Sequence, residues 1–206
     1  MNKHNMNMHN MNKHNMNMHN RLKTNPCTDN LSDLEYLEHM VPHHQVAIDM
    51  SKLLQPISSS DIMLHLCRNI IKKQSYEIFE MKNMKVYTGK LFTDETGVTD
   101  KNKTKLDLYN PKLSKSTSGP CNPLFFKPND HSKMMKSMKI TEKSFLEHMI
   151  PHHQVAINMS RRLLLHTNNS YLLDFCRKLI IDQQSEILYM NNLLSKHTYL
   201  YKSELL

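Results

Sequence analysis

The amino-acid sequence predicts an all-α protein, a four-helix bundle made of two repeated helical hairpins. One stretch of sequence occurs twice, and each copy is long enough for two helices. Within each copy the apolar residues recur at steps of three and four, which is the spacing of one face of an amphipathic helix. The chain of 206 residues contains only 3 glycines and no tryptophan, which argues against a turn-rich β-sandwich.

The repeat is clearest at EHMVPHHQVAIDMS, residues 38–51, which returns as EHMIPHHQVAINMS, residues 147–160. The same offset carries residues 74–81 onto residues 183–190 without a gap. Each copy is therefore a unit of about fifty residues, close to the size of two medium helices and a short turn. Two hairpins of matched length bury their apolar faces most simply against each other, as a pseudo-twofold bundle.

These repeats divide the chain into an Asn/His/Met-rich tail (1–30), a first hairpin (31–84), a polar crossover (85–140) and a second hairpin (141–206), with the hairpins forming one domain. The tail begins with the decapeptide MNKHNMNMHN, written twice without change. The decapeptides have no branched aliphatic residue to bury, so we expect them to be disordered. Replication slippage produces such repeats, but the closely spaced His and Met side chains would also suit a soft cation.

The first hairpin carries clear helix signals. Ser32 and Glu35 form an S-x-x-E capping box, which predicts that a helix starts near Asp33. Pro42 lacks a backbone donor and clashes with the preceding turn, so it should kink this helix or restart it. The adjacent histidines that follow fall on inward-facing stripes of the helix. Residues 55–61 form a polar turn, and a second amphipathic helix comes after it.

The second hairpin repeats this scheme, with helices over residues 141 to about 165 and 171 to about 194, joined by a polar turn. The crossover before it is polar and contains several prolines. Because so long an unstructured stretch is unusual in a compact domain, we expect a short helix before residue 140. The crossover ends in HSKMMKSM, residues 131–138, a third cluster of histidine with methionine.

The bulk properties narrow the choice of class and partner. The formal charge of +8 is compatible with an anionic partner such as nucleic acid, but much of the lysine lies in the crossover, so a solvated linker is favoured. No signal peptide and no run of about 20 apolar residues is present, so a soluble, intracellular protein is the default expectation. The 4 cysteines form no CxxC pair, and we expect reduced thiols.

The paired histidines of the two copies are the centre of the candidate site. Burying imidazoles is costly unless a metal ion or a polar network satisfies them. Methionines share the inward faces with these histidines, and Gln74 and Glu77 face them from the second helix of the hairpin. The candidate metal ligands are His39, Met40, His43, His44, Met50 and Met81, with their repeats His148, Met149, His152, His153, Met159 and Met190.

The donor types favour one metal over others. The HEXXH and paired-Cys signatures of zinc sites are absent, and no glutamate of these helices has a histidine three residues later, as di-iron bundles require. Thioether and imidazole donors with few hard oxygens favour Cu(I). A single buried His or Met is more often core packing, so a polar histidine core remains an alternative.

On these motifs the sequence resembles the ferritin-like DUF305 family (domain of unknown function 305). The family signature FLxxMIPHHQxAIxMA, followed by QxxEIxxM, matches residues 36–51 with 74–81 and residues 145–160 with 183–190. The resemblance implies a four-helix fold, and some exported bacterial relatives are described as copper-binding. It carries over Met40, Pro42, His43, His44, Gln45 and Met50 with their repeats, but not His39 or His148. The export signal of those relatives is missing.

The leading expectation is therefore a soluble metal-binding protein that sequesters or buffers Cu(I) through its His and Met side chains. The alternative is a structural or interaction module in which the histidines complete a polar core without metal. An enzyme ranks below both, because the sequence has no GxSxG motif and no phosphate-cradling glycine loop.

Overall fold

The structure, a computed structural model, describes residues 26–27, 29–91, 126–137 and 139–203. In these ranges the chain forms helices and no strand, which confirms the all-α prediction. The helices are α2 (Asp33–Leu54), α3 (Asp61–Leu91), α6 (Pro128–Ser137), α7 (Glu142–Leu163) and α8 (Ser170–Ser203). The decapeptides, for which we predict disorder, lie outside the described residues, as does most of the crossover.

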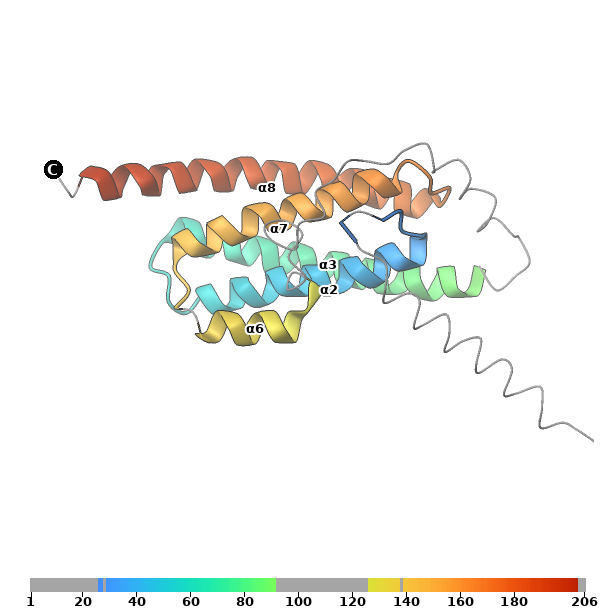
Figure 1. The fold of residues 1–206 in the computed structure, drawn as a ribbon, viewed down its shortest axis with the longest axis horizontal. Helices are drawn as coiled ribbons and strands as arrows, with labels where there is room; N and C mark the ends of the chain where they lie inside the picture. The colour runs from blue at the N-terminus through green and yellow to red at the C-terminus, as the bar shows by residue number, and fades with distance from the viewer. Residues whose placement is uncertain (1–25, 28, 92–125, 138, 204–206) are drawn as a thin grey trace, which may run out of the picture.

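The helices form two hairpins that lie side by side (Figure 1). Helix α2 packs against α3 and helix α7 packs against α8, while the contact between α2 and α7 joins the hairpins. Helix α6 lies at the edge of the bundle against α2, where Ser132 Oγ donates a hydrogen bond to Asp49 at 3.3 Å. This is the predicted bundle, and α6 is the short helix expected before residue 140. In the described part of the chain, no helix is both long and apolar enough to cross a membrane.

Side-chain caps determine where the first helix of each hairpin begins. Ser32 Oγ accepts the amide of Glu35, and the Glu35 carboxylate accepts the amide of Ser32 at 2.8 Å, so the predicted capping box is present. In the second copy Thr141 and Ser144 form the same reciprocal pair. Each box satisfies amides that the first turn of a helix cannot bond internally, which fixes the start of α2 and of α7.

Proline does not end either of these helices. Helix α2 runs through Pro42 and α7 runs through Pro151, so the restart that we considered does not occur. Each proline removes one backbone donor, and the hydrogen bonds on both sides keep the helix continuous. Helix α3 also continues to Leu91, past residue 84 and into the segment that we assign to the crossover.

Two hydrophobic clusters fill the bundle, one on each side of its middle. The first cluster includes Tyr36, Met40, Met81, Met159 and Cys176. The second cluster includes Met50, Cys67, Phe145, Met149 and Met190. Each cluster draws residues from both hairpins, so the apolar face of one hairpin is buried by the other. The repeat offset of 109 residues exchanges the members of the two clusters, which gives the bundle its pseudo-twofold symmetry.

Candidate metal centre

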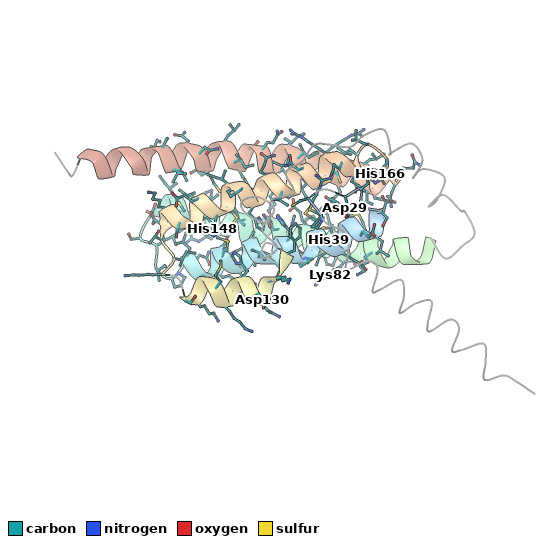
Figure 2. All side chains as sticks on the ribbon, in the orientation of Figure 1. Asp29, His39, Lys82, Asp130, His148 and His166 are labelled. Atoms are coloured by element: carbon teal, nitrogen blue, oxygen red, sulfur yellow. The ribbon has the colours of Figure 1, made fainter. Side chains whose placement is uncertain are left out.

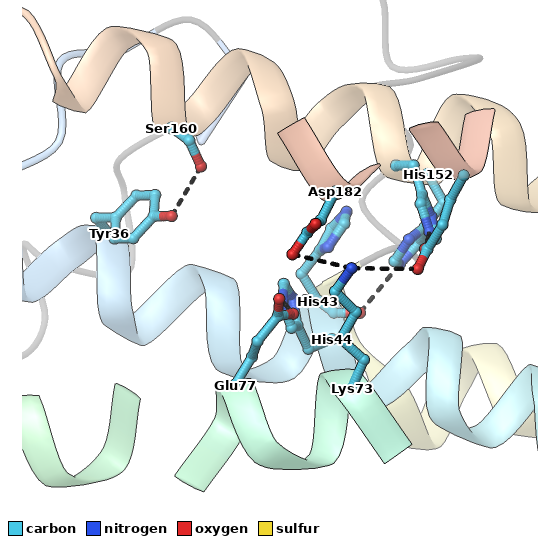
Figure 3. Close-up of polar contacts among 10 residues, drawn as sticks. Tyr36, His43, His44, Lys73, Glu77, His152, Ser160 and Asp182 are labelled. Atoms are coloured by element: carbon cyan, nitrogen blue, oxygen red, sulfur yellow. Dashed lines mark hydrogen bonds and ion pairs between the residues drawn. The ribbon is translucent and has the colours of Figure 1, made fainter. Parts of the chain in front are cut away.

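Four imidazoles lie buried between the two hydrophobic clusters. His43 and His44 come from the middle of α2, and their repeats His152 and His153 come from the middle of α7; all four, here called the central histidines, are 0% exposed. The rings of His43 and His152 stack with centroids 3.7 Å apart and planes 23° from parallel (Figure 3). The inward position that the helical spacing predicts for these residues is therefore present.

A glutamate holds one histidine of each pair. His44 Nε2 lies 2.8 Å from a carboxylate oxygen of Glu77, and His153 Nε2 lies 2.7 Å from the equivalent oxygen of Glu186. Burial raises the pKa of Glu186. The hydrogen bonds and charges of His153 and Lys73 together outweigh this effect, so the pKa lies below its usual value. The Glu186 carboxylate therefore accepts the Nε2 proton of His153, and Glu77 is placed to accept that of His44. In the neutral ring this leaves Nδ1 with the lone pair, and both Nδ1 atoms are buried without a hydrogen-bond partner among the described residues.

The other histidine of each pair breaks the symmetry. His152 Nε2 donates to the carbonyl oxygen of His43 at 3.0 Å, whereas both ring nitrogens of His43 are buried with no hydrogen-bond partner in the described ranges. Burial lowers the pKa of His43 and of His152 well below the usual value, and neighbouring histidines lower it further. Both rings are therefore neutral at physiological pH, and a neutral imidazole carries a lone pair that can bind a metal.

The four central histidines form a layer, here called the histidine layer. A pocket lies beside it, between α3 and α8. This pocket of about 810 Å³ has Lys73, Glu77 and Asp182 among its lining residues. Lys73 Nζ lies 2.9 Å from Asp182 and 3.6 Å from Glu186, the residue that contacts His153 (Figure 3). One ammonium group thus joins α3 to α8. The carboxylates that hold the central histidines are thus close to solvent, since Glu77 and Glu186 are 9% and 17% exposed.

The family profile of DUF305, a domain of unknown function, matches residues 1–86 and 92–194. The chain belongs to this family. Among the curated proteins, this DUF305 chain is similar to the uncharacterized protein L153 of Acanthamoeba polyphaga mimivirus, with 39% identity over 57 residues. That match covers 28% of the chain and 38% of the mimivirus protein.

Solved structures show the same fold. CopM in its Cu(II)-bound form superposes with a TM-score of 0.58 at 24% identity, covering 82% of this chain and 99% of that chain. A DUF305 fragment from Deinococcus radiodurans superposes with a TM-score of 0.50 at 19% identity, covering 80% of this chain and 95% of the fragment. The helical bundle is therefore the fold that this DUF305 chain shares with both.

The predicted sulfur donors of this DUF305 chain are buried, three in each hydrophobic cluster. Met40, Met81 and Met159 belong to the first cluster, and Met50, Met149 and Met190 belong to the second. Reduced cysteines also lie in both clusters, Cys27 and Cys176 in the first and Cys67 in the second. Burial raises the pKa of Cys176 to about 11 and that of Cys67 to about 12, so both thiols keep their protons at neutral pH.

The remaining two predicted ligands lie beside the end of the crossover. His39 is on α2 and His148 is on α7, both partly buried (Figure 2). The ring of His39 packs edge-on against Phe126 with centroids 6.0 Å apart, and the ring of His148 lies 6.4 Å from that of His131. His131 is buried, and this burial together with the charge of His148 lowers its pKa to about 4. The HSKMMKSM motif was the sequence signal for His131.

The residues present fit a metal ion by their chemistry. The layer offers imidazoles, and both ring nitrogens of His43 and the Nδ1 atoms of His44 and His153 have no hydrogen-bond partner among the described residues. In the same part of the chain, no three side chains of His, Cys, Asp or Glu converge on one point with metal-ligand geometry. This arrangement suits an ion that accepts few donors, or one whose ligand set includes groups of another kind.

Proposed function

We propose that this DUF305 protein binds copper ions at the central histidines and thereby sequesters or buffers the metal. The observation that supports this most directly is His43, whose ring is fully buried and neutral with both nitrogens unpaired. A buried polar atom without a partner costs about 1–3 kcal/mol. An ion bound at a ring nitrogen would offset that cost, and imidazole is a common ligand of copper.

The glutamates support the same proposal. Glu77 and Glu186 accept the Nε2 protons of His44 and His153, so that Nδ1 of each ring is left to act as the donor atom. Metal-binding histidines in proteins usually have such a carboxylate on the other ring nitrogen, because it fixes the tautomer and the ring orientation. Glu77, which contacts His44, also lines the pocket between α3 and α8.

Structural neighbours are consistent with copper as the ion. CopM has been solved in Cu(I)-bound, Cu(II)-bound and Ag-bound forms on the fold that this chain shares. For Cu(I), the thioether sulfurs of the two hydrophobic clusters are soft donors close in sequence to the histidines, with Met40 one turn before His43. We propose that they take part in binding the monovalent ion.

The substitution His43→Phe tests this function. Phenylalanine keeps a ring in the stack with His152 and removes both unpaired nitrogens, so the metal-free bundle should stay folded. We expect the affinity for Ag(I), which shares the charge and softness of Cu(I), to fall by more than about 100-fold, because even an outer-shell partner is worth about 10–100-fold. Competition against a chelator measures it. His65→Phe is the matched control, since His65 is an exposed histidine bonded to Asn69.

A structural module with a polar histidine core is the second candidate. The two His–Glu pairs and the bond from His152 to the His43 carbonyl favour it, because these contacts already satisfy much of the layer without an ion. Under this alternative the parent protein binds no Ag(I) or copper at the histidines, and His43→Phe changes only the melting temperature. Equal metal affinity of the parent and the variant would therefore favour the structural module.

A further inference from the structure

Two glutamine side chains in the middle of the bundle are buried without partners. Gln74 on α3 is 1% exposed and its repeat Gln183 on α8 is 2% exposed. Neither the amide oxygen nor the amide nitrogen of either residue has a hydrogen-bond partner among the described residues. Buried amides are almost always hydrogen-bonded, so the same exception at two equivalent positions indicates a missing partner.

Both glutamines lie close to the glutamates that contact the histidine layer. Gln74 lies one helical turn before Glu77 on the same face of α3, and Glu77 contacts His44. Gln183 holds the same position relative to Glu186, which contacts His153. The residues preceding the glutamines, Lys73 and Asp182, form the ion pair between α3 and α8. The amides therefore lie one helical turn from the carboxylates that contact His44 and His153.

We infer that Gln74 and Gln183 are oxygen ligands of an ion in this layer, and that the layer accepts Cu(II) as well as Cu(I). Imidazole nitrogen with amide oxygen is a donor set for Cu(II), whereas the thioethers in the flanking clusters suit only the monovalent ion. This inference rests on the proposed copper binding. It adds Cu(II) as a second ion and two amide oxygens as ligands.

The double substitution Gln74→Leu with Gln183→Leu, made in the full chain, tests the inference. Leucine has a similar volume and removes the unpaired amides, so the metal-free variant should melt at the parent temperature or above it. The affinity for Cu(II), measured by competition with a chelator, should fall at least about 10-fold, and the paramagnetic resonance spectrum of bound Cu(II) should change. The affinity for Ag(I) should stay within about twofold, because Ag(I) favours soft donors.

Gln45→Leu with Gln154→Leu is the matched control. These glutamines follow the central histidines in sequence, but their amides are already bonded, Gln45 to Asp49 at 2.8 Å and Gln154 to Asn158 at 2.9 Å. We expect this control to leave the Cu(II) affinity and spectrum unchanged. The tail histidines are common to the parent and both variants, so a change seen only with Gln74→Leu and Gln183→Leu arises in the bundle.

The outcomes separate the two proposals. If the parent binds Ag(I) but Gln74→Leu with Gln183→Leu binds Cu(II) as tightly as the parent, the glutamines are not ligands, while the proposed function stands. If that variant melts at a lower temperature without metal and keeps its Cu(II) affinity, the amides are structural. A parent protein that binds neither Ag(I) nor Cu(II) at the histidine layer would remove the proposed function and this inference together.

Discussion

The hydroxyl of Tyr36 allows a quantitative prediction, because the repeat contains its own comparison. Tyr36 is fully buried, and its oxygen lies 2.8 Å from Ser160 Oγ (Figure 3). The repeat of Tyr36 is Phe145, which has no hydroxyl, and the repeat of Ser160 is Ser51. Without a tyrosine opposite, Ser51 Oγ donates to the carbonyl oxygen of Ala47 at 2.8 Å.

The substitution Tyr36→Phe should therefore remove the hydrogen bond to Ser160 and a weaker contact of the hydroxyl with the Cys176 thiol. Ser160 can turn to the carbonyl oxygen of Ala156, as Ser51 does to that of Ala47, so it is not left unsatisfied. We expect the free energy of unfolding to fall by about 1 kcal/mol rather than by the larger cost of an unpaired buried hydroxyl. For a chain of this size that loss corresponds to about 2–4 °C in melting temperature.

Urea unfolding of the metal-free protein measures this loss of unfolding free energy. A double-mutant cycle combines Tyr36→Phe, Ser160→Ala and the variant that carries both changes. The coupling energy between Tyr36 and Ser160 should be about 1 kcal/mol. Burial raises the pKa of Tyr36 well above its usual value, so the hydroxyl stays neutral in the folded state and the result should not vary between pH 7 and 9. A loss above about 3 kcal/mol, or no coupling, would refute the compensation by Ala156.

Three further predictions concern acid stability, sulfur ligation and the tail. Burial lowers the pKa of His43 and His152, so only the unfolded imidazoles take up protons as the pH falls from about 6.5. The free energy of unfolding without metal should then fall by up to about 1.4 kcal/mol per pH unit for each of the two residues. In urea titrations between pH 6.5 and 5, His43→Phe should remove the contribution of His43 to this pH dependence. In a chain that lacks residues 1–20, Met50→Leu with Met159→Leu should weaken Ag(I) binding at a stability cost below about 1.5 kcal/mol, and an unchanged affinity would exclude these sulfurs as ligands. Deleting residues 1–20 should leave the melting temperature of the metal-free protein unchanged, and a large decrease would show that the decapeptides pack on the bundle.

Local signals in the sequence were sufficient for the helices. The capping box at Ser32, the steps of three and four, and the repeat offset predicted the elements and their pairing, because each depends on residues close in sequence or on one symmetry. The extent of α3 was less predictable. It continues to Leu91 through residues that carry no stop signal before Gly89, and composition alone placed them in the crossover.

The candidate site was predictable only in part, because its geometry depends on which faces meet between the hairpins. Helical spacing placed Met40 and His43 on one inward stripe, but could not show which apolar cluster each methionine joins. The unpaired state of Gln74 and the stack of His43 on His152 likewise arise from contacts between segments far apart in the chain. The sequence did contain one signal for such a contact, because Lys73 and its repeat Asp182 carry opposite charges.

Those opposite charges bear on how a duplicated protein can evolve. Residues 73 and 182 occupy the same place in the two copies and meet where the hairpins face each other. In an association of two identical hairpins, the same contact would bring lysine against lysine or aspartate against aspartate, and the charges would repel. Once both copies lie in one gene, each can mutate separately, and a charge pair becomes possible at a position where an identical dimer forbids it. A hairpin taken from this chain should therefore associate with the other hairpin in preference to itself.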